Sequence, residues 1–264
     1  MPILTALGSS TSRAYGQNGN ILIPGNSGII TSGSSYTLPY TSGMSVNVLV
    51  IAGGGGGGGG SFRNASNAGY NVGAGGGGAG GNAYATSISV LPGQTISFSI
   101  GAAGSAGSGR DGGYSSNPGS PGGVGGNGSV TINGTVVAAV TGGGNGILSP
   151  DSTAGYAGGL STGTQATAPN AGGAGTSTNQ FTGQGGYGGA GYTLNTTIGL
   201  AIGSIIGYGN PGYTYTAGGA SSVSGTIYGA GGGGGGTNQS DQQSGANAIP
   251  AAGTVGAVFI WWGY

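Results

Sequence analysis

The stretch VNVLVIAGGGGGGGG, residues 46–60, contains the two kinds of segment from which the rest of the chain is built. Its first half is apolar and mostly β-branched, which is typical of a buried strand. Its second half is eight consecutive glycines, which have no side chain to bury and lose the most backbone entropy when ordered. An ordered glycine run must therefore be stabilised by backbone hydrogen bonds and close packing between neighbouring runs, and the polyproline II conformation suits both.

Glycine dominates the composition, with 73 Gly and 10 Pro among 264 residues. Such a content is common in disordered, low-complexity chains. Disordered chains, however, usually have high net charge and few aromatic residues, whereas this one has 2% charged residues, zero net charge and 14 Tyr. No strict Gly-X-Y repeat runs through the glycine blocks, which argues against collagen. We therefore expect an ordered protein.

The missing residue types exclude most kinds of chemistry. The chain has no Cys, His, Lys or Glu, so we expect no disulfide, no transition-metal site and no cofactor. Acid–base catalysis would depend on three scattered Asp and the tyrosines, and three Arg cannot form a groove that follows a phosphate backbone. We predict that the protein is not an enzyme and binds no nucleic acid. The charged residues are Arg13, Arg63, Arg110, Asp111, Asp151 and Asp241.

The N-terminal residues MPILTALGSSTSRAYG lack the basic and long apolar parts of a classical signal peptide. No stretch reaches the ~20 apolar residues of a membrane span, so we expect no membrane insertion. Assembly into a virus particle that is released by lysis is one way for such a protein to act outside the cell.

Several short segments have the alternation or the β-branched content of strands. Asn133-Gly134, between SVTI and TVVAAV, is the strongest signal for a two-residue hairpin turn, and Leu-Pro-Gly at residues 91–93 joins two further segments. The last apolar segment, AVFIWW at residues 257–262, can pair with residues 46–52. No α-helical pattern occurs. The predicted fold is therefore irregular and all-β-like, a bundle or sandwich of packed polyglycine (polyproline II) helices with short strands and hairpins at one end.

Glycine-rich runs alternate with the other segments from residues 53–60 to residues 253–256. If successive runs go alternately up and down, the links between them sort to two ends of the bundle. The apolar strand segments then fall at one end, the base, with the links 82–100, 129–140, 176–182, 221–228 and 258–262. The opposite end, the far end, has the links 61–72, 110–121, 147–170, 192–216 and 237–252. All the charged residues except Arg13 fall at the far end.

Three motifs have a simpler explanation than a ligand or modification site. VLVIAGGGGGGGG matches a strand followed by G-x-G-x-x-G, but no helix pattern follows and no acidic residue precedes Asp111, as a dinucleotide site would require. The Asn-X-Ser/Thr sequons are expected by chance in a chain so rich in Asn, Ser and Thr. Arg110-Asp111 is either a solvated ion pair in a loop, which we favour, or half of a ligand clamp.

Tyrosines are the clearest functional signal at the far end. Tyr gives a large, rigid contact surface with a polar tip, and together with Ser, Gly and Asn it is typical of binding surfaces. The segment GYGNPGYTYTAG, residues 207–218, has this composition and follows the apolar GLAIGSIIG. The alternative is that these residues form a small core that closes the tip. The predicted receptor-binding residues are Arg63, Tyr70, Arg110, Asp111, Tyr114, Tyr156, Tyr192, Ile205, Ile206, Tyr208, Tyr213 and Tyr215.

The order of these segments resembles a known family. VNVLVIAGGGGGGGG, GGGGAGGNAYATSISVLPGQTISFSIGAAG, the later glycine blocks and the closing GTVGAVFIWW are similar to the glycine-rich domain of phage tail-fibre proteins, best described in the distal tail-fibre adhesin of T-even-type phages. The resemblance covers about residues 46–264, the predicted glycine-rich domain, and leaves residues 1–45 as a short N-terminal attachment segment. It implies a sandwich of polyproline II glycine helices whose variable distal loops bind outer-membrane proteins or surface glycans.

We therefore expect a receptor-binding adhesin at the tip of a phage tail fibre, located in the virion and acting at the host cell surface. Its expected partners are a bacterial surface protein or glycan at the far end and another tail-fibre or virion protein at the base. Two alternatives stay open. One is a virion structural component, such as a fibre, decoration or appendage protein, without direct receptor contact. The other is an ice-binding or matrix protein on a polyglycine scaffold, which would present a flat Thr/Ala face.

Overall fold

The computed structural model contains strands and glycine runs, and none of the residues that it describes lies in a helix. This agrees with the predicted irregular, all-β-like fold. The described residues are 29–30, 35–37, 44–59, 74–108, 120–146, 161–162, 176–179, 182–184, 188–189, 192–195, 201–204, 228–235, 237–238 and 250–262.

Two antiparallel sheets form the base, with the strand orders β1-β14-β3-β4 and β2-β5-β6-β7-β8. The strands of the first sheet are β1 (Ile29–Ile30), β14 (Ala257–Trp262), β3 (Met44–Ile51) and β4 (Asn82–Val90). Those of the second are β2 (Ser35–Thr37), β5 (Thr95–Ser99), β6 (Gly128–Ile132), β7 (Thr135–Val140) and β8 (Ser161–Thr162). Strands β1 and β2 come from the predicted attachment segment, and each pairs with a strand of the glycine-rich domain.

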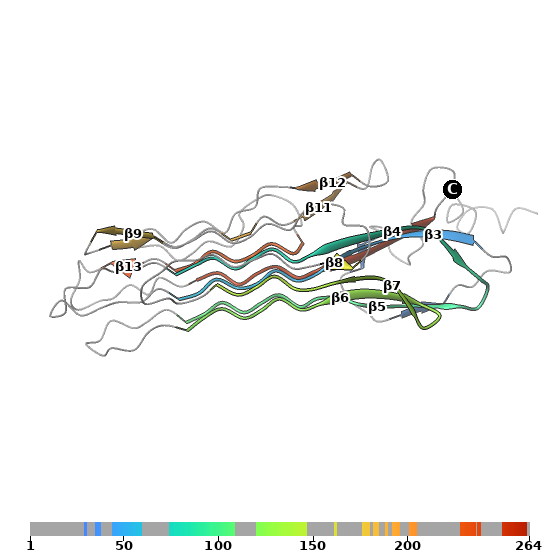
Figure 1. Cartoon of the computed structure of the whole chain (residues 1–264), viewed down its shortest axis with the longest axis horizontal. Helices are drawn as coiled ribbons and strands as arrows, with labels where there is room; N and C mark the ends of the chain where they lie inside the picture. The colour runs from blue at the N-terminus through green and yellow to red at the C-terminus, as the bar shows by residue number, and fades with distance from the viewer. Residues whose placement is uncertain are drawn as a thin grey trace, which may run out of the picture.

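Two smaller sheets lie outside the base. The first consists of β9 (Thr176–Asn179), β10 (Thr182–Gln184) and β13 (Thr237–Asn238), and the second of β11 (Tyr192–Asn195) and β12 (Ala201–Ser204). Figure 1 shows that the glycine runs leave the base as wavy traces and lead toward β9 and β13, which mark the far end. Strands therefore occur at both ends of the bundle and not at the base alone.

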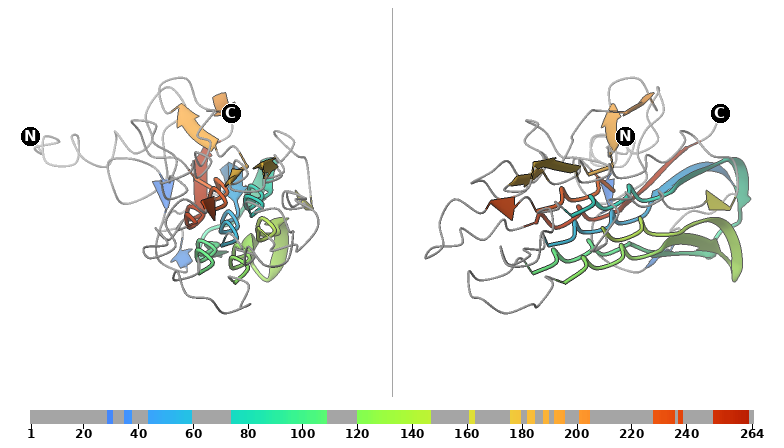
Figure 2. Two further views of the ribbon diagram at one scale, coloured as in Figure 1. Left: turned by 90° about the vertical axis from the view of Figure 1, so that its left-hand side faces the viewer. Right: turned by 60° about the vertical axis from the view of Figure 1, so that its left-hand side comes forward.

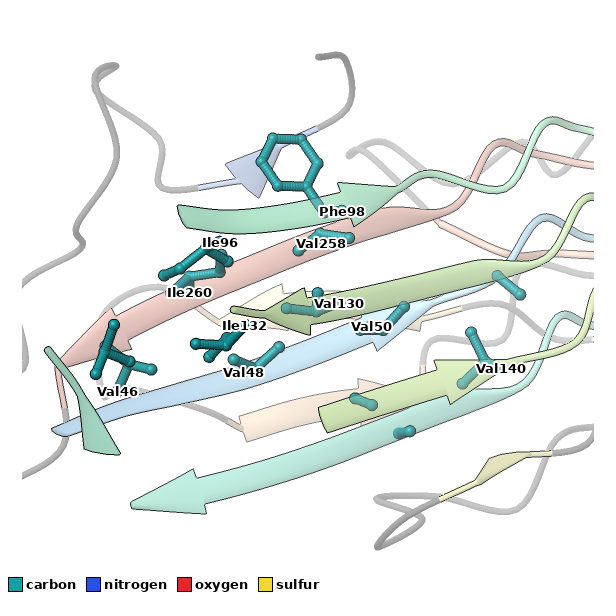
Figure 3. Packing of buried hydrophobic residues seen from close by; sticks show 14 residues of the cluster. Val46, Val48, Val50, Ile96, Phe98, Val130, Ile132, Val140, Val258 and Ile260 are labelled. Carbon is teal, nitrogen blue, oxygen red and sulfur yellow. The ribbon is translucent and has the colours of Figure 1, made fainter. Parts of the chain in front are cut away.

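The hydrophobic core lies between the two base sheets. Alternate residues of β3, Val46, Val48 and Val50, are completely buried against residues such as Ile96 and Val130 of the second sheet, as Figure 3 shows. Period-2 alternation sends these side chains to one face of the sheet. The second sheet alternates more clearly, because the residues between the buried ones in β5 are exposed.

The predicted contact between the first and last apolar segments is confirmed. β14 pairs with β3 along its whole length, in a register that runs from Ala257 opposite Ile51 to Trp262 opposite Val46. The predicted hairpin turn is confirmed too, since Asn133 and Gly134 have φ angles of 46° and 81° between β6 and β7. Two positive φ angles are typical of a type I′ turn.

Glycine-rich runs cross the bundle, and Figure 2 shows them end-on as small coils packed side by side. Seven of them form the described centre. We number these seven in chain order and use these names below. They are run 1 (52–59), run 2 (74–81), run 3 (101–108), run 4 (120–127), run 5 (141–146), run 6 (229–235) and run 7 (250–256). A further glycine segment, described at residues 188–189, lies outside runs 2 and 6: Gly189 N–H donates to Gly77 O and Gly189 O accepts from Gly231 N–H, both at 2.8 Å.

Run 1 lies at the centre and exchanges hydrogen bonds with all six other runs. The N–H groups of residues 53, 54 and 55 donate to run 4, run 7 and run 2, at N···O distances of 3.0, 2.9 and 2.9 Å. The carbonyl oxygens of the same residues accept from run 5, run 3 and run 6, at 2.9, 2.8 and 2.8 Å. The cycle repeats at residues 56–58. A three-residue repeat is that of the polyproline II helix.

The six neighbours also bond to one another and close a ring around run 1, in the order 2-5-4-3-7-6 and back to 2. Runs 2, 4 and 7 are antiparallel to run 1, while runs 3, 5 and 6 are parallel to it, as the paired residue numbers show. Neighbours in the ring therefore alternate in direction. The predicted up-and-down alternation is confirmed for runs 1 to 5 and for runs 6 and 7.

Glycine is required in these runs mainly because a side chain would not fit between neighbouring runs, and less because of the backbone angles. Among the described residues of the runs, Gly229 has a positive φ. A Cβ added to Gly53 would lie 1.9 Å from the carbonyl oxygen of Ala102, and one added to Gly55 would lie 2.0 Å from that of Gly144. The hydrogen that the Cβ would replace therefore points at a carbonyl oxygen, and Cα–H···O contacts join the N–H···O bonds in holding the runs together.

The outer runs have side chains, and these side chains point outward. In run 3 the glycines recur at every third position, Gly101, Gly104 and Gly107, and all three are buried. The residues between them are alanines and serines, most of which are exposed. In run 4 the exposed residues also recur at every third position, and Val124 is one of them. The three-residue repeat thus gives each outer run a glycine face and a side-chain face.

Candidate functional site

The far ends of the runs lie in one layer, which the last residues of run 1 hold together. Gly58 N–H donates to Gly75 O (3.1 Å) near the start of run 2, and Gly58 O accepts from Gly235 N–H (2.9 Å) at the end of run 6. Gly59 N–H donates to Ser120 O (3.0 Å) at the start of run 4. The positions at which the chain leaves and re-enters the bundle are therefore fixed relative to one another.

Two of the predicted binding segments start and finish at this layer. Runs 1 and 3 arrive at the far end and runs 2 and 4 leave from it, so residues 60–73 and 109–119 connect run ends there. The predicted binding residues in these segments lie outside the described residues. They are Arg63, Tyr70, Arg110, Asp111 and Tyr114.

Two serines join the run ends that flank residues 109–119. Ser120 N–H donates to Ser108 O (2.9 Å), Ser108 N–H donates to Ser120 Oγ (2.7 Å), and the Ser108 hydroxyl donates to Ser120 Oγ (2.8 Å). No sequence motif indicated this pair. The one feature of the sequence that could have indicated it is that a serine ends run 3 and another serine begins run 4, on either side of residues 109–119.

The course of the chain between runs 5 and 6 differs from the predicted one. The alternation predicts residues 147–170 as a single far-end link, but β8 pairs with β7 at the base. It also predicts the link 176–182 at the base, but β10 pairs with β9 and with β13, which follows the far end of run 6. Both predictions are wrong. The chain returns to the base before residue 161, and no glycine block in residues 147–160 indicated this crossing.

Tyr192 is the predicted binding residue that falls within a described element, because it is the first residue of β11. Its backbone pairs with that of Ser204 in β12. Figures 1 and 2 show the β11–β12 hairpin near the start of β4 and away from β9 and β13, which mark the far end. The prediction that the link 192–216 lies at the far end is therefore wrong for the part of it that the structure describes. The remaining predicted binding residues lie outside the described residues. They are Tyr156, Ile205, Ile206, Tyr208, Tyr213 and Tyr215.

The described surface is uncharged, because every Arg and Asp of the chain lies outside the described residues. Within the described residues no three His, Cys, Asp or Glu side chains come together as a metal site would require. The same residues include no helix long and apolar enough to cross a membrane. Burial raises the pKa of the Tyr84 hydroxyl in β4 above its usual range.

The comparison with protein families gives a clear result for this arrangement of glycine runs and closing strands. The model of a family described as a glycine-rich domain matches residues 30–262. The chain belongs to this glycine-rich domain family. The match begins within β1 and ends with β14, so it includes both sheets of the base as well as the runs. No curated protein sequence matches the chain.

Proposed function

We propose that this glycine-rich domain protein is a receptor-binding adhesin at the tip of a phage tail fibre. In this proposal the far-end segments contact a molecule on the bacterial surface. The observation that supports it is the common far-end layer, in which run 1 fixes the ends of its neighbours, while the segments that connect these ends contain Arg63, Tyr70, Arg110, Asp111 and Tyr114. Binding residues are commonly found on loops that a rigid framework positions.

The framework suits binding because it limits the entropy lost on association. Each run is hydrogen-bonded to its neighbours at every third residue, so the points where the segments attach are already ordered before binding. Affinity is lowered by the cost of ordering the contacting groups, and a fixed framework reduces that cost. Tyr70 and Tyr114 in the segments that connect run ends at this layer, and Tyr208, Tyr213 and Tyr215 in the later segment 207–218, would add rigid aromatic contacts of the kind found in other binding surfaces.

The base suits attachment to another tail-fibre or virion protein. Its two sheets pack around a continuous hydrophobic core, and the N-terminal strands β1 and β2 each pair at an edge of one sheet. A partner at the base would leave the far end free. The proposed location is therefore the virion, at the tip of the fibre, and the proposed site of action is the host cell surface.

The binding test uses the whole chain, fluorescently labelled, on a panel of bacterial strains. We expect the wild type to label a subset of strains and the triple variant Tyr208→Ala, Tyr213→Ala, Tyr215→Ala to lose that labelling without a change in melting temperature. A second variant, Arg110→Ala with Asp111→Ala, tests the far-end segment 109–119. The matched control is Ser105→Ala, on the side of run 3, which should bind like the wild type.

The outcomes separate the alternatives. A wild type that labels no strain but is found in purified virions would contradict the adhesin and favour a virion structural component. If the triple tyrosine variant unfolds, these tyrosines form a core at the tip, and the binding role must then be tested with the Arg110 and Asp111 variant.

A further inference from the structure

The dipeptide Asn-Gly occurs at three places among the residues that the structure describes, and each is a candidate for chemical modification. In this dipeptide the asparagine carboxamide can react with the backbone nitrogen of the next residue, which glycine leaves unshielded because it has no side chain. The three pairs share this chemistry, so their surroundings determine which of them reacts in the folded protein. They are Asn127-Gly128, Asn133-Gly134 and Asn145-Gly146.

The reaction is a deamidation in which water is the only co-reactant. The backbone nitrogen of the glycine loses its proton and attacks Cγ of the asparagine. A bond from that nitrogen to Cγ forms, and the Cγ–Nδ2 bond breaks with release of ammonia. Water then opens the resulting cyclic imide. Opening at Cγ gives aspartate, whereas opening at the backbone carbonyl carbon gives isoaspartate, in which the main chain runs through Cβ and Cγ.

Asn133-Gly134 is open to this reaction. Both residues are exposed in the turn between β6 and β7, at the end of the molecule opposite β9 and β13 (Figure 1). A Cβ added to Gly134 would meet no atom within 4 Å outside the adjoining residues. The turn is tied to β5 by a hydrogen bond from Asn133 N–H to Thr95 O, at 3.2 Å. The attack requires the turn to open, and few contacts oppose that opening.

Asn127 is exposed too, but its reacting groups are held. Its side-chain Oδ1 accepts a hydrogen bond from Gly142 N–H at 3.0 Å, which joins run 4 to run 5 and fixes the orientation of the carboxamide. Gly128 is buried at the start of β6, where an added Cβ would lie 2.9 Å from Cγ1 of Val50. The side chain and the glycine must both leave these positions before they react.

Asn145 lies within run 5, where a backbone hydrogen bond holds the attacking nitrogen. Gly146 is buried, and its N–H donates to Gly56 O of the central run at 2.8 Å. On the other side of the asparagine, Gly144 O accepts from Gly78 N–H at 2.8 Å. The run must separate from its neighbours to bring the Gly146 nitrogen to the Asn145 side chain. The folded bundle therefore protects this pair.

We propose that Asn133 is a site of spontaneous deamidation at the base, and that its isoaspartate form breaks the β6–β7 turn. A two-residue hairpin turn fixes the register of its strands, and isoaspartate lengthens the main chain there by one carbon atom. The strands of this hairpin supply Val130, Ile132 and Val140 to the core between the base sheets. A change of register moves these side chains, so the modification lowers the stability of the base. The proposal is independent of receptor binding.

Ageing of the whole, folded chain in mildly alkaline solution tests the proposal. Samples taken over time are digested with pepsin in acid, where the reaction is slow, and mass spectrometry of the peptides gives the fraction of amide left at each asparagine. We expect Asn133 to react at least about tenfold faster than Asn127 and Asn145. The same chain unfolded in urea is the control. There the three sites should react at similar rates, because glycine follows each of them.

The variant Asn133→Gly tests the consequence, because Gly-Gly suits the positive φ angles of the turn but has no carboxamide. We expect the melting temperature of the wild type to fall during ageing, in step with isoaspartate at residue 133 measured by enzymatic methylation. That of Asn133→Gly should stay constant. The matched control Asn145→Gly retains the reactive turn and should age like the wild type.

The proposal is overturned if Asn133 keeps its amide in the folded chain while the unfolded chain reacts. It is overturned as well if Asn127 or Asn145 reacts as fast as Asn133 in the folded chain. A melting temperature that falls equally in Asn133→Gly, or that stays constant while isoaspartate accumulates in the wild type, would contradict the effect on the turn.

Discussion

Run 1 and run 3 have similar lengths and the same three-residue repeat, but they differ in what surrounds them. Residues 53–59 of run 1 are all glycine and all buried, and they exchange hydrogen bonds with six neighbours. Run 3 keeps glycine at every third position, where it faces the bundle, and has alanine or serine elsewhere. Another run can pack only against a face that has no side chains. An all-glycine run can therefore be surrounded by six others, whereas a run with side chains on one face stays at the edge.

The remaining runs follow the same relation. Run 6 has one alanine, Ala230, and all of its residues are buried. Run 4 has Pro121, Val124 and Asn127 at the positions that face away from run 1, and these three residues are exposed. The spacing of side chains in a run thus indicates whether it belongs in the interior or at the edge of the bundle.

The largest expected effect comes from adding a side chain to the central run. In Gly55→Ala the new Cβ would lie 2.0 Å from the oxygen and 2.6 Å from the carbon of the Gly144 carbonyl. Run 1 cannot move away because neighbours surround it. We expect a loss of more than about 4 kcal/mol in unfolding free energy, which can unfold the protein altogether. Urea denaturation followed by circular dichroism measures it, and a wild-type midpoint would contradict the space argument.

A smaller effect is expected on the glycine face of the edge run. In Gly104→Ala the Cβ would lie 2.3 Å from Gly123 O and 2.6 Å from Gly56 N. Run 3 has solvent on its other side and can shift outward, so we expect a loss of about 1–3 kcal/mol. The neighbouring change Ser105→Ala, on the exposed face, should stay within about 0.5 kcal/mol. Equal losses in the two run 3 variants would show that the run has no distinct faces.

A side-chain oxygen can also accept a hydrogen bond from a backbone N–H that has no carbonyl partner in a neighbouring run. This gives a third prediction. Thr254 Oγ1 in run 7 accepts a hydrogen bond from Ala230 N–H at 2.7 Å, in a partly buried position. Thr254→Val keeps the shape but leaves that N–H without its acceptor, and we expect a loss of about 1–2 kcal/mol. Thermal or urea unfolding measures the change. Thr254→Ser, which retains the hydroxyl, should restore most of the loss.

The smallest effect is expected outside the runs, from the titration of Tyr84 in β4. Burial disfavours the charged phenolate and raises its pKa in the folded state. The stability that depends on the neutral hydroxyl is therefore complete below the unfolded pKa of about 10 and is lost as the pH rises through the folded value. We expect the urea midpoint to fall in strongly alkaline solution, and to fall less in Tyr84→Phe. An identical fall in both proteins would exclude Tyr84 as its source.

Local features made much of the fold predictable from the sequence. Asn133-Gly134 specifies its turn through backbone angles alone, and the pairing of β3 with β14 joins the apolar segments that open and close the glycine-rich domain. The assumed up-and-down alternation of successive runs holds for runs 1 to 5 and for runs 6 and 7. The prediction failed for residues 147–170, because the chain crosses the bundle there without a glycine block.

The candidate site was predictable in a different way. The positions of Tyr, Arg and Asp in the sequence identified the candidate segments, and the run boundaries placed two of them, 60–73 and 109–119, at the far end. The Ser108–Ser120 pair could not be predicted, because it depends on the axial offset between two antiparallel runs.

The sequence by itself determined that this protein has no Cys, His, Lys or Glu, that its glycine runs must pair through their backbones, and that strands close its base. It also determined the glycine face of each run, because the three-residue repeat is a property of the polyproline II chain. Only the tertiary structure decided which run is central, which runs form the ring and in what order. The physical reason is that a glycine run has no side chain to distinguish one neighbour from another, so the order around run 1 is set by the links and sheets that connect the runs.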